Sequence, residues 1–219
     1  MFGKWVLKII AALKGQGKKM SNKDCDNQET IWTAAVNGDW ETVKQLLERE
    51  PSLINVTDDG GVTLLHFAAS NSNIVVLEYL ISQGADVNVK AQYGETPLHW
   101  ATRWNSDVDV LEYLVSRGND VNVKEIYGHT PLHFAAMVNS SVEVLKCLVS
   151  KGADVNARNC WDDTPLYEAA GWNDNAKVLE YLISQGADVN AKNEHGETAL
   201  DIADTDEKKN FLRGCIQGK

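Results

Sequence analysis

The sequence lacks the cysteine spacing that metal sites and disulfide frameworks require. Its four cysteines, Cys25, Cys147, Cys160 and Cys215, are scattered along the chain, with no CxxC or CxxH pair. Disulfide-rich secreted domains and zinc sites both show close, regular cysteine spacing. We therefore expect no disulfide framework, no bound metal or other cofactor, and a reducing, cytoplasmic setting.

Long hydrophobic runs and catalytic motifs are also missing. No stretch approaches the roughly 18 consecutive apolar residues that a transmembrane helix needs. There is no glycine-rich phosphate loop, no GxSxG and no HExxH. Acidic pairs such as Asp162-Asp163 would need a concave pocket to shift a pKa for acid–base catalysis. These absences predict a protein that is not an enzyme.

Positive charge is scarce outside the N-terminus, and the formal net charge is −10. Five of the 21 lysines and arginines lie in residues 1–19, which contain no acid, so residues 20–219 carry 16 basic against 31 acidic groups. Affinity for duplex nucleic acid depends on contacts to phosphates. The acidic excess therefore argues against nucleic acid and predicts a protein partner with a basic surface.

Residues 1–19 form a segment with its own pattern, followed by a polar linker at 20–25. On a helical wheel, apolar side chains fall on one side of this segment and lysines on the other. Such a basic amphipathic helix can lie on an anionic membrane surface. The candidate contacts are Lys4, Trp5, Lys8, Ile9 and Lys14. Two other interpretations stay open, a helix that caps the first repeat and a leader, and Met20 is an alternative natural start.

What the sequence does contain is one recurring stretch, clearest at residues 130–156, TPLHFAAMVNSSVEVLKCLVSKGADVN. Near-copies begin at Thr63, Thr96, Thr164 and, with a weaker match, Thr198. These threonines are spaced 33, 34, 34 and 34 residues apart. A fixed period in this range indicates an array of stacked structural repeats.

Each copy carries the signals of two helices. The initial threonine can cap a helix, and Pro97, Pro131 and Pro165 occupy the first helical position, where a missing N–H costs nothing. A second helix carries apolar residues in an i, i+1, i+4, i+5 pattern that makes one stripe. This pattern occurs at Val110, Leu111, Leu114 and Val115, at Val144, Leu145, Leu148 and Val149, and at Val178, Leu179, Leu182 and Ile183. One unit could not bury its stripe alone, so stacking must supply a continuous core.

The TPLH and GADVN motifs at this period resemble the ankyrin-repeat family. The resemblance implies an all-α solenoid of helix–turn–helix units with β-hairpin-like fingers, about six units including two caps. The expected boundaries are an N-capping repeat at 26–59, repeats at 60–92, 93–126, 127–160 and 161–194, and a C-capping repeat at 195–219. In the finger near Trp161, Asp162 replaces the turn glycine, and aspartate tolerates a left-handed backbone better than most residues.

Three histidines recur at one position of the repeat, His66, His99 and His133. Stacked repeats hold them about 10 Å apart, too far for one metal ion with bonds of ~2 Å. The resemblance implies that they are structural and bond backbone groups of neighbouring fingers. Tyr167 and Asp201 take the position in later copies, which a shared metal site would not allow.

By the same resemblance, partners are bound by the concave face, at finger residues beside the turn glycine and at the ends of the first helices. Several of these positions carry large aromatic residues, although folding needs no apolar group there. Tyr, Trp, Met and Arg are the types enriched in interface hot spots. The candidate set is Gln92, Tyr93, Glu95, Arg103, Trp104, Ile126, Tyr127, His129, Met137, Val138, Trp161, Asp163 and Trp172.

The function expected from these observations is a non-catalytic protein–protein interaction module, an adaptor or an inhibitor, acting as a cytoplasmic monomer. The alternative is a scaffold tethered to a membrane surface by residues 1–19. An enzyme would need a pocket with convergent perturbed groups, which the sequence does not show.

Overall fold

The structure, a computed structural model, describes residues 30–71, 73–104, 107–139 and 141–217. Within these ranges all regular structure is helical and no strand occurs. Residues 30–36 are helical, and the first two elements that follow are α3 (Trp40–Arg49) and the 3-10 helix η1 (Pro51–Asn55). The remaining helices are α4 (Leu64–Ser70), α5 (Ile74–Ser82), α6 (Pro97–Trp104), α7 (Val108–Ser116), α8 (Pro131–Val138), α9 (Val142–Ser150), α10 (Pro165–Trp172), α11 (Ala176–Ser184), α12 (Ala199–Ile202) and α13 (Asp206–Gln217).

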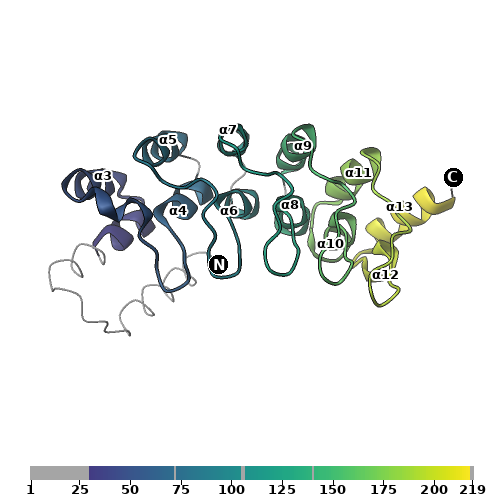
Figure 1. Cartoon of the computed structure of the whole chain (residues 1–219). Coiled ribbons are helices and arrows are strands. Elements are labelled where there is room, and N and C mark those ends of the chain that lie inside the picture. The colour runs from purple at the N-terminus through teal and green to yellow at the C-terminus, as the bar shows by residue number, and fades with distance from the viewer. Residues whose placement is uncertain (1–29, 72, 105–106, 140, 218–219) are drawn as a thin grey trace.

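The helices form two parallel rows in an elongated array (Figure 1). The inner row is α4, α6, α8, α10 and α12, in which each helix contacts the next, and the outer row contains α5, α7, α9 and α11. Loops project from the inner row on one side of the array. We call these loops fingers one to five, at residues 57–62, 90–95, 124–129, 158–163 and 192–197. The expected solenoid of stacked helix pairs is confirmed.

The core runs the length of the array between the two rows of helices. The predicted apolar stripes face it, since Val110, Leu111 and Leu114 on α7 and their equivalents on α9 and α11 are fully buried. The inner helices add Leu98 and Leu132, also without exposure. Each element therefore buries its apolar side only against its neighbours, as repeat proteins require.

Caps fix where the inner helices begin. The threonine before α8, Thr130, and the N3 residue His133 form a capping box, which satisfies backbone N–H groups that the first helical turn leaves unpaired. Pro131, Pro165 and Pro97 are the first residues of their helices, as expected from the sequence. Because each helix starts at a fixed residue, each finger ends at a fixed place on the inner row.

Candidate functional site

The three repeated histidines connect one unit to the next finger. The Nδ1 atom of His133 accepts the Thr130 backbone N–H at 3.1 Å, so Nε2 carries the proton and donates to the carbonyl oxygen of Asp163, 3.1 Å away. His66 bonds Thr63 and the Glu95 carbonyl in the same way. Burial lowers the pKa of His66 to about 4 and that of His133 to about 3. Their predicted structural role is confirmed.

Backbone bonds between adjacent fingers fix the register of the exposed residues. The N–H of Ile126 donates to Tyr93 O at 2.9 Å, that of Cys160 to Tyr127 O at 2.8 Å, and that of Glu194 to Trp161 O at 2.9 Å. The fingers hold these positions without forming strands in the described residues. Each finger tip is therefore set one repeat from the next by its own backbone.

The fourth finger keeps this geometry without a turn glycine. Asp162 has a φ of +62° and is the one non-glycine residue with positive φ in the described chain. Asparagine and aspartate tolerate this region because their short polar side chains bond locally. Cys160 and Glu194 still make the bonds to the neighbouring fingers. Asp162 therefore adopts the left-handed backbone of the turn, and the finger keeps its bonds to both neighbours.

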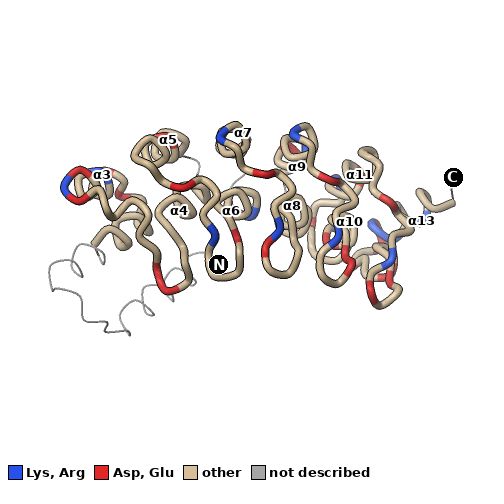
Figure 2. The backbone as a smooth tube through the Cα atoms, viewed as in Figure 1, with Lys and Arg blue, Asp and Glu red and all other residues tan. Residues whose placement is uncertain are grey.

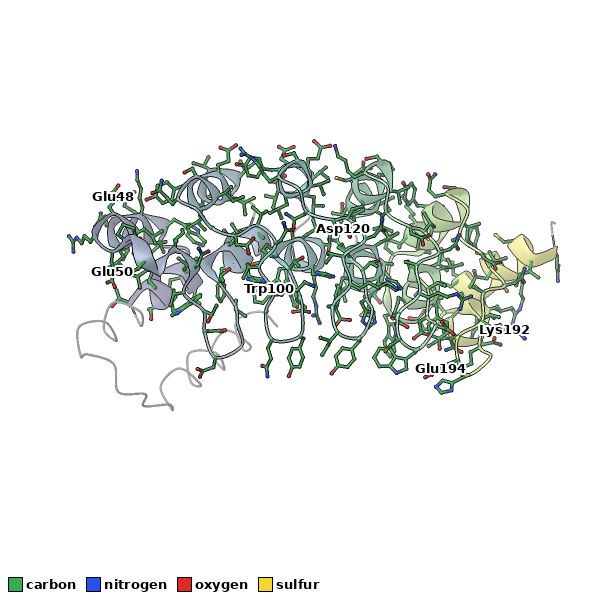
Figure 3. All side chains as sticks on the ribbon, viewed as in Figure 1. Glu48, Glu50, Trp100, Asp120, Lys192 and Glu194 are labelled. Carbon is green, nitrogen blue, oxygen red and sulfur yellow. The ribbon has the colours of Figure 1, made fainter. Side chains whose placement is uncertain are left out.

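Eight of the thirteen candidate binding residues have exposed side chains. They are Gln92, Tyr93, Trp104, Ile126, Tyr127, Val138, Trp161 and Trp172. Without Gln92, this set contains seven of the eight large hydrophobic side chains that are exposed in the described chain, and Val75 on α5 is the eighth. We call these seven residues the exposed ridge; finger side chains are drawn pointing away from the helices in Figure 3.

Ring contacts connect the finger tips of the ridge to the ends of the inner helices. Tyr127 and Trp161 stack with centroids 5.6 Å apart and planes 18° apart. Trp161 lies 5.7 Å from the His129 ring, which lies 5.5 Å from Phe134. The Arg103 guanidinium lies 5.1 Å from the rings of both Phe134 and Trp104. The structure therefore brings fingers three and four and the ends of α6 and α8 into one surface.

Four other candidates are partly buried. Arg103 forms an ion pair with Glu95 at 3.3 Å, and the other Glu95 oxygen accepts from Trp100 Nε1 at 3.1 Å. Asp163 accepts from Asn193 Nδ2 at 3.0 Å, and Met137 lies beside Val138 at the end of α8. The contacts of Arg103, Glu95 and Asp163 hold these side chains in place at the edge of the ridge.

His129 does not have the free side chain expected of a contact residue. It is buried, and both ring nitrogens lie near carboxylates, Nδ1 at 2.9 Å from Glu125 and Nε2 at 3.3 Å from Glu168. The physical reason is that Glu168 replaces an apolar residue on α10, and a buried carboxylate requires a partner. Burial alone would lower the pKa of His129, but hydrogen bonds and charges of Glu168 and Glu125 outweigh it, so that pKa is raised.

The buried residues Glu125, Asn159 and Glu168 around His129 were not singled out from the sequence. One signal was available for Glu168, which occupies the column of Phe67, Trp100 and Phe134 on the preceding inner helices. A carboxylate in an apolar column needs a polar partner. Nothing in the sequence pairs it with His129, which lies on a finger 39 positions earlier.

The described residues offer no arrangement for metal chemistry. No group of three or more His, Cys, Asp or Glu in them could hold a metal ion. In the same part of the chain, no helix is long and apolar enough to cross a bilayer. The candidate membrane contacts Lys4, Trp5, Lys8, Ile9 and Lys14 lie outside the described residues. The described structure does contain a set of exposed rings with carboxylates beside them.

Comparison with known proteins gives matches to one type of repeat. The chain is 44% identical over 59 residues to the palmitoyltransferase akr1 of Schizosaccharomyces pombe, covering 27% of this chain and 9% of that protein. It is 38% identical over 77 residues to alpha-latrocrustotoxin-Lt1a of Latrodectus tredecimguttatus, covering 35% of this chain and 5% of the toxin. It is 36% identical over 93 residues to the human palmitoyltransferase ZDHHC17, covering 41% of this chain and 15% of that enzyme.

These relatives share only a small part of their length with this chain, so their names describe proteins much larger than the matched stretch. A family model described as ankyrin repeats (3 copies) matches residues 6–91, 31–125, 86–159, 107–193 and 132–210. These overlapping matches cover residues 6–210, which include every helix from α3 to α12 and the start of α13. The chain belongs to the ankyrin-repeat family.

Proposed function

We propose that this chain is a non-catalytic adaptor or inhibitor that binds another protein through the exposed ridge. The observation that carries the proposal is the ridge itself, seven exposed apolar side chains at positions that the repeat does not need for its core. Singly exposed apolar residues are common, but a connected patch of them is typical of an interaction site. Its Tyr and Trp content matches the composition of interface hot spots.

The acidic residues around the ridge favour a partner with a basic surface. Asp162 and Glu194 on the fourth and fifth fingers have side chains that are 58% and 45% exposed. Figure 2 shows acidic residues on each of the fingers. Lys124 and Arg158, at the starts of two fingers, donate to the carbonyl oxygens of Arg158 and Lys192 in the next finger. Complementary charge at the rim would raise the association rate more than the affinity.

Replacing Trp161 or Trp104 by alanine is expected to weaken partner binding by about 2 kcal/mol each, roughly thirtyfold, because each removes an exposed ring from the connected surface. Proteins captured on the immobilised parent chain would be identified, and their affinity for each variant measured by calorimetry. The thermal unfolding of both variants should match that of the parent.

Val75→Ala provides the matched control for this experiment. Val75 is as exposed as the ridge residues but lies on α5 in the outer row, away from the fingers. Its substitution is expected to leave partner binding unchanged. If the two tryptophan variants bind as well as the parent, or if Val75→Ala weakens binding equally, the ridge is not the binding surface.

A second candidate function is a scaffold attached to a membrane surface, working as a monomer in the cytoplasm. It is favoured by the helical wheel of residues 1–19, which has apolar residues on one side and lysines on the other. The chain is expected to float with anionic vesicles only when residues 1–19 are present. Equal flotation of the full chain and of residues 20–219, or none by either, would remove this candidate.

A further inference from the structure

A buried ion triad lies directly beneath the ridge. Glu125 on the third finger, His129 at the end of that finger and Glu168 on α10 are all buried, and Asn159 of the fourth finger completes the cluster. Burying charged groups is costly unless they are paired and hydrogen-bonded. The two carboxylates share one imidazole, so both are paired with it only when His129 carries a proton on both ring nitrogens.

The cluster also holds the turns of two fingers. One carboxylate oxygen of Glu125 accepts the backbone N–H of Tyr127 at 2.9 Å and that of His129 at 3.0 Å. Asn159 Oδ1 accepts the N–H groups of Trp161 and Asp163, each at 2.9 Å. The Asn159 amide nitrogen lies 3.1 Å from His129 Nε2. The polar groups that shape fingers three and four therefore meet at one imidazole.

The His129 imidazole also contacts the exposed ring of Trp161. The His129 ring lies 5.7 Å from Trp161 at an interplanar angle of 54°, and Trp161 stacks on Tyr127. The equivalents of His129 on the neighbouring fingers are Glu95 and Asp163, and neither of these residues contacts two carboxylates. The third finger alone thus connects an exposed ring pair to a buried charge.

We propose that His129, held as a cation between Glu125 and Glu168, is the positioning residue for the Tyr127–Trp161 pair, and that loss of its proton weakens partner binding by the ridge. The proposal rests on the proposed function of the ridge. A neutral imidazole can donate to only one of the two carboxylates. With its proton on Nδ1, facing Glu125, Nε2 accepts the Asn159 amide N–H 3.1 Å away, and the attraction to the Glu168 carboxylate, 3.3 Å away, is lost. Glu168 then keeps only the Asn159 amide, at 3.5 Å.

The neighbouring histidines and the neighbouring thiol differ from His129 in the direction or the range of their pKa shifts. Besides Glu125 and Glu168, it faces His99 on α6 and His133 on α8. Burial lowers the pKa of His99 to about 4 and that of His133 to about 3, so both are neutral there. Lys124 precedes Glu125 in the same finger.

The thiol of Cys160 lies on the next finger, and desolvation raises its pKa. His99, His133 and Cys160 therefore do not compete with His129 for protons between about pH 6 and pH 8.

The sign of the effect follows from the direction of the pKa shift. The folded-state pKa of His129 lies above its ordinary value, so the attraction within the triad is fully present below about pH 6.5. It is lost as the pH rises through the raised pKa. Binding by the ridge is therefore expected to weaken as the pH rises above about 6.5, a range in which the three structural histidines no longer change their charge.

The test follows the indole N–H signal of Trp161 by NMR between about pH 6 and pH 9, assigned with Trp161→Phe. The signal should shift with the same midpoint as the His129 ring in the parent chain. The shift should vanish in His129→Gln and move to lower pH in Glu168→Gln. His195→Gln, in the exposed finger five, is the matched control and should behave like the parent.

Affinity is measured in parallel with a synthetic peptide of alternating lysine and leucine, which offers both the charge and the apolar groups that the ridge would recognise. Parent affinity is expected to fall about fivefold from pH 6.5 to pH 9, with no such fall in His129→Gln. The positioning role of His129 is overturned if the Trp161 signal does not change with pH in the parent. It is also overturned if the signal shifts equally in His129→Gln.

The two proposals fail in different ways. If Trp161→Ala leaves the affinity for the peptide unchanged, the ridge is not the surface that binds it, and the NMR titration still decides the role of His129. If Trp161→Ala weakens binding but the parent affinity does not depend on pH, the ridge stands and the positioning role of His129 is wrong.

Discussion

Lowering the pH from 7 to about 4 is expected to remove most of the stability of this protein. His66 and His99 have pKa values of about 4 and His133 of about 3, because burial opposes their charging. The unfolded chain protonates near pH 6.5. Stability from these neutral histidines is therefore fully present above pH 6.5 and is lost as the pH falls toward the folded-state values.

The expected loss is roughly 3 kcal/mol for each histidine, which in total is comparable with the whole stability of a typical domain. Urea unfolding followed by circular dichroism at pH 7, 5.5 and 4.5 measures it. Each of the three histidines accepts a threonine N–H through Nδ1, and a proton there would break that bond.

Two variants separate this cause from general acid effects. His133→Gln should lose about a third of the pH dependence below pH 6.5, since the amide can accept and donate but does not titrate. His195→Gln should keep the parent's dependence, because His195 is exposed. A free energy of unfolding that is the same at pH 7 and pH 4.5 would show that the histidines are not held neutral.

Gly128→Ala is expected to destabilise the fold by about 3 kcal/mol. Gly128 has a φ of +81°, a left-handed conformation that costs a residue with a Cβ about 1–2 kcal/mol. A Cβ added there would also lie 3.0 Å from the Cys160 backbone nitrogen and 3.1 Å from Asn159 Cα. Backbone atoms of the next finger have little freedom to move, and such crowding costs about 1–3 kcal/mol more.

Gly196→Ala is the matched control for this substitution. Gly196 has a φ of +78° at the same place in the fifth finger, but no atom lies within 4 Å of an added Cβ. Gly196→Ala should lower the free energy of unfolding only by the cost of the left-handed backbone, about 1 kcal/mol, as measured by urea unfolding. Equal losses for Gly128→Ala and Gly196→Ala would contradict a close approach between fingers three and four.

The sequence predicted the helices well because their signals are local. Thr130 and Pro131 start α8, and the spacing of Val144, Leu145 and Leu148 defines the buried side of α9. These features depend on residues within a few positions of each other. Repetition then reinforced each local signal several times, so the solenoid followed without any knowledge of distant contacts.

The exposed ridge was predicted only in part from the sequence, because the exposure of a side chain depends on the repeat next to it. Trp161 and Trp172 are exposed as expected, although Trp161 stacks on Tyr127 of the preceding unit. His129 has an equally favourable position in its finger, yet it is buried by Glu168 from the next unit. The neighbouring unit also limits the size of the residue at position 171. A Cβ added to Gly171 would lie 3.0 Å from the side chain of Ile202.

The sequence by itself determined the all-α repeat architecture, the structural role of His66, His99 and His133, and the region that carries the exposed aromatic residues. Only the tertiary structure decided which of those residues connect into one surface and which are buried. The reason is that capping and helical periodicity act within one unit, whereas the contacts of Glu125, His129 and Glu168 join two fingers and a helix through stacking. A buried charge has no local sequence signature for its partner, and its pairing appears only when the units are in place.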